Sequence, residues 1–256
     1  MRAPSAIARG RMFSPLTATA QAELLRSLVE RSRPRSGEPR PVVVFDLDGT
    51  IFDNRPRTVA ILKAYAEKVR HTRPDLAERL GALHHEAVPY LLADALARVG
   101  ITDEADVNDL RDHWVSCFFV DEWLHHDVAI LGAVDFAKAC WQNGASLVYL
   151  TGRDLPKMSL GSFASLRDTG FPIGVPGTAL VCKPDPAIAD EHYKREVCPE
   201  MARVGKVIAS FDNEPGNCNA FLEHFPSAAS VLLATQHMPG APALASGCAT
   251  ILDFRH

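Results

Sequence analysis

Apolar residues recur along this chain in two alternating patterns. Apolar positions with the three- and four-residue spacing of an amphipathic helix occur at Gly132–Gln142, at Asp190–Val204 with Asp190 as the expected N-cap, and after the turn DNEPGN through Phe221. Short, β-branched runs, typical of strands buried on both faces of a parallel sheet, occur at Pro41–Asp46, Ser146–Thr151, Thr178–Cys182, Lys206–Phe211, Ser230–Ala234 and Thr250–Phe254. Strands that alternate with helices predict an α/β fold with a doubly wound, Rossmann-like parallel sheet.

A long helical region separates the first two of these strands. Its apolar positions predict helices at Asn54–Val69, Leu76–Leu83, Glu86–Val99 and Glu104–Phe119, with no convincing strand between them. We therefore expect residues 41–53 and 126–256 to form the core and residues 54–125 to form an inserted helical cap.

Residues 1–40 form an Arg-rich N-terminal segment and linker. Residues 1–41 hold eight arginines, no lysine and three acids, so this part has a net charge of +5 and the remainder −9. The spacing of apolar residues predicts a loose helix at Ala18–Arg33, packed on the body, and the Pro- and Gly-containing RSRPRSGEPRP then predicts a linker. The alternatives are an organellar transit segment, which is also Arg-rich and acid-poor, and an arm that binds a partner.

Composition narrows the class of protein. The chain is 47% hydrophobic and 23% charged, as soluble globular proteins are, and its net charge of −4 argues against a dedicated nucleic-acid binder. No run approaches 18 consecutive apolar residues, so we expect no membrane span. The six cysteines form no CxxC pair, which predicts reduced thiols and a cytoplasmic protein. The oligomeric state stays open.

Polar residues follow the predicted strands at their carboxyl ends, where open parallel sheets bind ligands. These residues are Asp46, Asp48, Thr151, Asp212, Asn213 and Glu214. Carboxylates that meet there repel each other, and a hard cation such as Mg²⁺ relieves the repulsion. An upstream lysine, either Lys183 or Lys194, would add positive charge. The set suits a phosphoryl group brought to an aspartate, since carboxylates can act as phosphoryl acceptors.

The motifs that contain these residues are FDLDGT, YLTGR, an upstream lysine and FDNEP, in this order. They resemble the haloacid dehalogenase (HAD) superfamily, and the long helical insertion resembles a cap of the C1 type. The resemblance implies a Mg²⁺-dependent phosphatase acting on a small phosphorylated substrate. It implies Asp46 as the nucleophile, Asp48 as the general acid and base with its carbonyl on the metal, Thr151 as a phosphoryl ligand and Asp212 as a metal ligand.

The neighbours of these motifs leave several roles open. The family often has two adjacent acids in the last motif, whereas here Asn213 follows Asp212, so Asn213 would ligate through its carbonyl and Glu214 is an alternative carboxylate. Gly152 and Arg153 are candidate substrate-binding residues, and Arg153 with Asp154 could equally form only a turn. Lys194 is favoured over Lys183 as the phosphate-site lysine, because 18 residues to Asp212 fit one helix and one strand.

Other functions remain as alternatives. A phosphomutase or phosphonatase could use the same scaffold, and a phosphonatase would need a cap lysine, for which Lys63 and Lys68 are candidates. A non-catalytic module that binds phosphate or metal would be expected to lack Asp46 or Asp48, and both are present. An end-processing phosphatase for nucleic acids would need a basic body, and this body is acidic.

Aromatic and histidine residues in the insertion have two readings. Trp114, Phe118, Phe119 and Trp123 are expected mainly to pack the cap, with a substrate-lining role as the alternative. The pairs His84-His85 and His125-His126 are poor chelates, because adjacent residues on a helix point about 100° apart.

Overall fold

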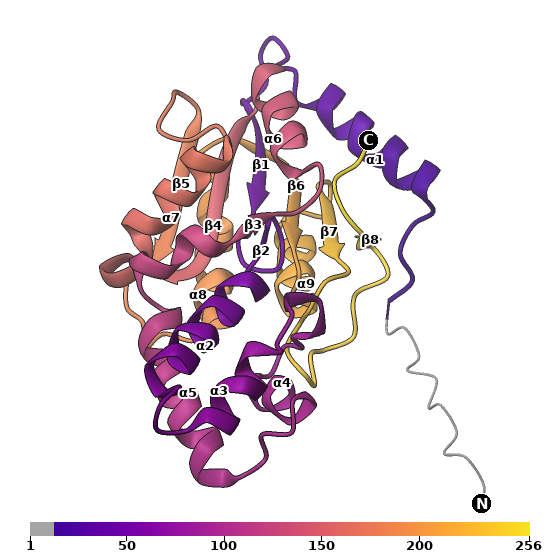
Figure 1. Ribbon diagram of the computed structural model, residues 1–256. Helices are drawn as coiled ribbons and strands as arrows, with labels where there is room; N and C mark the ends of the chain where they lie inside the picture. Colours follow the sequence, from indigo (N-terminus) through magenta and orange to yellow (C-terminus); the bar gives the residue numbers. More distant parts are fainter. Residues whose placement is uncertain (1–12) are drawn as a thin grey trace, which may run out of the picture.

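The computed structural model describes residues 13–256 and contains a six-stranded parallel sheet (Figure 1). Its strand order is β5-β4-β1-β6-β7-β8, so the chain starts in the middle, builds one side and then returns to build the other. This is the doubly wound α/β fold that the alternating pattern predicts. The strands are β1 (Pro41–Phe45), β4 (Ser146–Asp154), β5 (Thr178–Lys183), β6 (Lys206–Asp212), β7 (Ala229–Leu233) and β8 (Ala249–Ile251).

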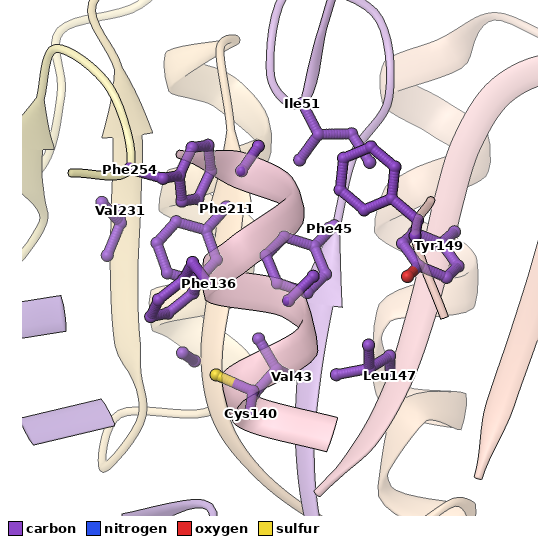
Figure 2. Close-up of a cluster of buried hydrophobic side chains, with 14 of the residues drawn as sticks. Val43, Phe45, Ile51, Phe136, Cys140, Leu147, Tyr149, Phe211, Val231 and Phe254 are labelled. Carbon is purple, nitrogen blue, oxygen red and sulfur yellow. The ribbon is translucent and has the colours of Figure 1, made fainter. Parts of the chain in front are cut away.

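Helices cover both faces of the sheet. One face packs against α1 (Ala18–Arg31), α6 (Ala133–Gln142) and α7 (Leu155–Thr169), and the other against α8 (Asp190–Val197), a 3₁₀ turn η3 (Cys198–Arg203) and α9 (Pro215–His224). Figure 2 shows the larger core cluster, in which Phe45 of β1 stacks on Phe211 of β6 at 5.2 Å between ring centroids, with Phe136 of α6 edge-on to both. These rings hold the middle strands of the sheet in place.

The helical cap lies beyond the carboxyl ends of the strands (Figure 1). It leaves and rejoins the core through a two-stranded antiparallel ribbon, β2 (Phe52–Asp53) with β3 (Val128–Ala129), and has its own apolar cluster built around Leu62, Leu80 and Leu110. Its elements are α2 (Arg55–Val69), α3 (Pro74–Gly81), η1 (His85–Ala87), α4 (Leu92–Arg98), α5 (Glu104–Phe118) and η2 (Asp121–His126).

Proline explains two differences from the predicted helices. The helix expected at 86–99 is a 3₁₀ turn followed by α4, because Pro89 interrupts the hydrogen-bonding pattern between them. The helix expected at 190–204 ends at Val197 and continues as η3, which begins with Cys198-Pro199. Asp190 is the first residue of α8 and not its N-cap, which is Ala189.

Helix α7 is a feature that the apolar pattern did not predict. Asp154 caps it by accepting a hydrogen bond from the Lys157 backbone N–H at 2.9 Å, Pro156 lies in its first turn, and Gly170 ends it with φ +95°. This combination of N-cap, early proline and C-terminal glycine is a known start-and-stop signal that outweighs weak periodicity.

Helix α1 packs on the body as expected, but more firmly than a loose helix would. Leu25 and Leu28 are fully buried in the larger core cluster, and the Gln21 side chain donates to Asp253 Oδ1 at 2.9 Å. Burial of these leucines removes apolar surface from water, which fixes the helix against the body. The start of the possible transit segment, residues 1–12, lies outside the described residues.

The cysteines, the helices and the potential metal ligands can each be compared with the expectations from the sequence. All six cysteines lie within the described residues and are free thiols. Among residues 13–256, no helix combines the length and apolar character that a membrane crossing requires. In the same range, no group of three or more His, Cys, Asp and Glu side chains is placed to hold a metal ion.

Candidate active site

The loop after β1 places two carboxylates at the carboxyl end of the sheet. The fully buried β1 runs into Asp46, whose backbone N–H donates to the Phe211 carbonyl of β6 at 3.0 Å. Gly49 then turns the chain with φ +74°, and a Cβ there would lie 2.5 Å from Asn213 Nδ2. Only glycine fits this turn without displacing Asn213, so the DGT sequence aims both aspartates at the same end of the sheet.

Asp46 lies in a buried group that we call the Asp46 cluster: Asp46, Asp212 and Lys194. Lys194 Nζ of α8 donates to Asp46 Oδ1 at 2.6 Å and to Asp212 Oδ2 at 2.8 Å. Asn217 of α9 donates to both oxygens of Asp212 at 3.1 and 3.2 Å. The cluster therefore holds two carboxylates and one cation, which leaves it one positive charge short.

This charge deficit sets the protonation of Asp46. Burial raises its pKa, and the nearby Asp212 charge raises it further, so that despite the opposing effect of Lys194 the pKa reaches about 7. Burial opposes the charge on Lys194 too, but Asp212 and Asp46 outweigh it and raise the pKa of the ammonium, which stays protonated. An additional cation near Asp46 would restore its ionised form.

Asp48 lies in a second group, the Asp48 cluster: Asp48, Asp127, Arg57 and Arg153. The Arg153 guanidinium donates to both oxygens of Asp48 at 2.7 and 2.8 Å, and its Nη2 donates to Asp127 Oδ2 at 2.6 Å. Arg57 Nη2 donates to Asp48 Oδ1 at 2.6 Å. Two cations here balance two carboxylates.

The arginines decide the charge on Asp48. Burial works against its ionised form, but Arg153 and Arg57 outweigh burial and hold the pKa of this carboxyl well below its usual range. Asp48 is therefore ionised in this arrangement.

Arg57 joins the cap to the core. It lies in the first turn of α2 with a fully buried side chain, and its Nη1 donates to the Phe118 carbonyl of α5 at 2.9 Å. Its Nε is 2.9 Å from Asp127 Oδ1, although neither atom has a well-directed hydrogen bond. The guanidinium also lies 3.9 Å above the centre of the Phe118 ring. One side chain thus links the β1 loop, the segment before β3 and the end of α5.

The TGR sequence continues β4 past the sheet. Thr151 is almost fully buried, and its Oγ1 accepts a hydrogen bond from the Arg153 backbone N–H at 3.1 Å. At Gly152 a Cβ would lie 2.3 Å from Asp190 Oδ2, so a side chain there would crowd the first residue of α8. Thr151, Gly152 and Arg153 all line the same cavity as Asp46.

The two candidate lysines have different surroundings. Lys194 reaches Asp46 and Asp212, whereas Lys183 Nζ forms an ion pair with Asp190 Oδ1 at 2.6 Å. Asp190 is 62% exposed on its side chain, so this second pair lies toward solvent. The structure thus brings together Asp46, Asp212 and Lys194 and leaves Lys183 outside that group.

The last motif supplies an amide and not a second carboxylate near Asp46. Thr50 Oγ1 contacts both Asp46 Oδ2 at 3.1 Å and Asn213 Oδ1 at 3.3 Å, while Asn213 Nδ2 donates to the Gln236 carbonyl at 2.6 Å. The amide oxygen of Asn213 therefore faces Asp46. Both oxygens of Glu214 instead accept from the Met238 backbone N–H, at 3.0 and 3.2 Å.

These oxygens suit a hard divalent cation. Mg²⁺ is typically held by one or two carboxylates together with waters and phosphate oxygens, and it needs no third acid. Asp46 and Asp212 would be the carboxylates, with the Asn213 amide oxygen and the Asp48 carbonyl as further donors. The missing positive charge in the Asp46 cluster and the oxygen-only donor set both fit such an ion.

A cavity of about 610 Å³ opens above these residues, between the core and the cap. Asp46, Thr151 and Lys194 line it from the core. Its cap-side lining contains four aromatic rings, Tyr90, Trp114, Phe118 and Phe119, beside Asn54, Arg55, Thr58, Val88 and Pro89. Three of the four cap aromatics singled out in the sequence thus line the cavity, whereas Trp123 is not among its lining residues.

Arg57, Asp127 and Asn217 were not recognised from the sequence. Arg57 and Asp127 are 70 positions apart, but Asp53 pairs with Val128 in the β2–β3 ribbon, which brings the two charges together. Asn217 lies in the first turn of α9, five residues after Asp212. The signal available for Asn217 was a polar residue in the helix that directly follows the turn sequence. No local signal pointed to Arg57 or Asp127.

Comparison with known proteins finds similar folds among solved structures. No protein-family model and no curated protein matches the sequence. A candidate phosphatase of known structure from Clostridium difficile is 12% identical, with 78% of this chain and 88% of that chain covered and a TM-score of 0.50. A HAD hydrolase of family IA, variant 3, from Entamoeba histolytica is 14% identical, with 84% and 93% covered and a TM-score of 0.49.

A HAD-superfamily hydrolase of subfamily IA, variant 1, from Geobacter sulfurreducens is 13% identical, with 78% and 91% covered and a TM-score of 0.46. At such identities the likeness concerns the fold alone. The six-stranded parallel sheet with its inserted helical cap confirms the architecture expected from the motifs. The chain is similar in fold to the Clostridium difficile structure, and its fold is the one that the haloacid dehalogenase resemblance implies.

Proposed function

We propose that the chain is a Mg²⁺-dependent phosphatase that hydrolyses a small phosphomonoester through an aspartyl-phosphate on Asp46. The observation that carries the proposal is the Asp46 cluster, whose buried carboxylate Asp46 and lysine Lys194 line one cavity together with Thr151. The phosphatase and hydrolase names of the similar structures agree with it.

The first step transfers the phosphoryl group to the protein. A carboxylate oxygen of Asp46 attacks phosphorus, the bond from phosphorus to the leaving oxygen breaks, and the leaving oxygen takes the proton of Asp48, which Asp48 regains from the attacking water of the second step. Lys194 and the Thr151 hydroxyl offset the charge of the phosphoryl oxygens, and preorganised donors of this kind act where water is excluded. A Mg²⁺ ion held by Asp46, Asp212 and Asn213 would supply further positive charge for the phosphoryl group.

The second step frees Asp46. Water attacks phosphorus, the bond from phosphorus to Asp46 breaks, and a base takes the proton from the water. Asp48 is in the ionised form that this step needs. To give a proton to the leaving oxygen in the first step, Asp48 must first acquire one, which the two arginines oppose.

The cap surroundings disfavour one alternative. A phosphonatase would need a cap lysine at the reacting carbon, but Lys63 and Lys68 are exposed on α2 and neither lines the cavity. The proposed phosphatase reaction needs no lysine from the cap.

Activity on a panel of phosphomonoesters, with Mg²⁺ and with EDTA, tests the proposal. We expect Mg²⁺-dependent release of phosphate by the wild type and by Asp168→Asn, a control at an exposed ion pair. Asp46→Asn should lose activity, and intact-mass measurement after acid quench should show a phosphorylated wild type only. Full activity in Asp46→Asn, or no hydrolysis by the wild type, would contradict the mechanism.

A further inference from the structure

The cap side of the cavity presents aromatic rings that remain partly open. Tyr90 is 42% and Phe119 is 44% exposed, which is high for large apolar side chains, and both line the cavity. Exposed apolar surface within a cleft typically marks a ligand-binding site. The rings line the cavity from the cap, whereas Asp46 lines it from the core.

These rings are held in a fixed arrangement. Trp114 Nε1 donates to Thr58 Oγ1 at 3.2 Å, and the Trp114 ring stacks on Phe118 at 4.2 Å between centroids. Phe119 lies edge-on to Trp114 at 5.8 Å. Phe118 in turn lies under the Arg57 guanidinium. Because the rings are already ordered, a ligand that contacts them causes little further loss of conformational freedom.

The cations that line the cavity are already paired with carboxylates. Arg55 Nη2 and Nε donate to the two oxygens of Asp53, at 2.6 and 2.8 Å. The other two lining cations, Arg153 and Lys194, belong to the Asp48 and Asp46 clusters. Among the described residues that line the cavity, every lysine and arginine therefore has an acidic partner, and none is left over for a second anionic group of the substrate.

Acidic residues border the cavity beside Tyr90. Burial, together with the nearby charges of Glu214 and Asp190, raises the pKa of Tyr90 to about 12. Glu214 and Asp190 line the cavity themselves. A carboxylate or second phosphate on the leaving group would meet these acids without a free cation, which costs electrostatic free energy.

We infer that the preferred substrates of this site have a leaving group that contains an aromatic ring and no negative charge. The inference rests on the proposed function for the phosphate end and concerns only the opposite end. The ring packs on the wall formed by Trp114, Phe119 and Tyr90 while the phosphate lies at Asp46. Rings packed offset or edge-to-face attract each other beyond the effect of the area they bury.

Three alkyl phosphates test the inference as matched pairs: 2-phenylethyl phosphate, ethyl phosphate and 2-phosphoglycolate. The first two differ by a phenyl ring, and the last two by a carboxylate. We expect kcat/KM to be about tenfold or more higher for 2-phenylethyl than for ethyl phosphate, as apolar contacts typically give. Phosphoglycolate should be slower than ethyl phosphate. Equal values for the first pair, or faster turnover of phosphoglycolate, would overturn the inference.

Variants locate the preference. Phe119→Ala and Tyr90→Ala should each lower the ratio of kcat/KM for 2-phenylethyl over ethyl phosphate. Phe163→Ala removes a partly exposed ring on α7 that does not line the cavity, and it should leave the ratio unchanged. If the first two variants keep the wild-type ratio, the aromatic wall does not bind the leaving group.

Binding without turnover separates this inference from the proposed function. Titration calorimetry would compare 2-phenylethylphosphonate with ethylphosphonate, which cannot be hydrolysed by this route. Tighter binding of the aromatic compound by the wild type, weakened in Phe119→Ala, supports the inference even if no phosphate ester is hydrolysed. Equal binding of both, or binding of neither, counts against it, whereas hydrolysis of all three esters at similar rates would leave the proposed function standing alone.

Discussion

Asp46 and Asp48 are separated by one residue, yet their surroundings push their pKa values in opposite directions. The Asp46 cluster contains two carboxylates and one cation, and the pKa of Asp46 rises to about 7. The Asp48 cluster contains two carboxylates and two arginines, and the pKa of Asp48 falls below its usual range. Burial raises the pKa of both carboxyls, and Asp48 has two arginine partners where Asp46 has one lysine, which accounts for the opposite directions.

The two clusters differ in whether the protein's own side chains balance their charge. The Asp48 cluster is balanced by the protein's own side chains and links cap to core. The Asp46 cluster retains an excess negative charge at the floor of a cavity, where a cation or a phosphate accompanied by a cation could bind. Where the surroundings of two carboxyl groups push their pKa values apart, one group often acts as the acid and the other as the base of an enzyme.

The largest effect should be the loss of stability when a charge is removed from the Asp48 cluster. In Asp127→Asn, the buried Arg57 and Arg153 lose an anionic partner, and the free energy of unfolding should fall by about 3–5 kcal/mol. Urea unfolding of the wild type and variant measures the change. Asp168→Asn, at an exposed ion pair, should change the free energy of unfolding little. Similar losses for the two variants would show that the Asp48 cluster does not stabilise the fold.

Removal of the cation from the unbalanced cluster should affect catalysis next most strongly. Lys194→Ala should lower kcat by about 10²–10³, the cost of losing one preorganised charge or donor at a reacting group. Lys183→Ala is the matched variant, because its ammonium pairs with Asp190 at the edge of the cavity, and its kcat should change far less. The reverse order would assign the phosphate-site lysine to Lys183.

A smaller effect should appear in the pH dependence of stability without divalent cations. The raised pKa of Asp46 means that the folded state holds a proton that the unfolded state releases near pH 4. The stability from this group is complete below that pH and is lost as the pH rises through about 7, at up to about 1.4 kcal/mol per pH unit. Asp46→Asn should lack this decline in urea unfolding between pH 4.5 and 8. Parallel curves for the two proteins would show that Asp46 does not titrate as stated.

The sequence was most informative where chemistry and local structure coincide. The residues of FDLDGT, TGR and FDNEP follow buried strands, and parallel strands deliver their carboxyl ends to one edge. The meeting of Asp46 and Asp212 could therefore be expected. Lys194 followed from the length of a helix and a strand, although the helix proved to be a shorter helix with a 3₁₀ turn.

The Asp48 cluster could not be foreseen in the same way. Arg57 and Asp127 are isolated charges in their own segments, and their neighbours in sequence say nothing about Asp48. Their proximity depends on the register of the short β2–β3 ribbon and on how α5 packs on α2. Periodicity also missed α7, whose signals are its capping residues and not its apolar pattern.

The β2–β3 ribbon has a consequence for how this molecule can change. The cap leaves the core at Asp53 and returns at Val128, and these two residues are paired partners in the ribbon. Because the ends of the insertion are held together in this way, its length can vary at only a small entropic cost to the sheet. A transplanted cap would have to retain the ribbon and replace or preserve Arg57, while the aromatic wall could be exchanged as a unit. Under the proposed function, the substrate preference could therefore change with the cap while the residues of the core stay in place.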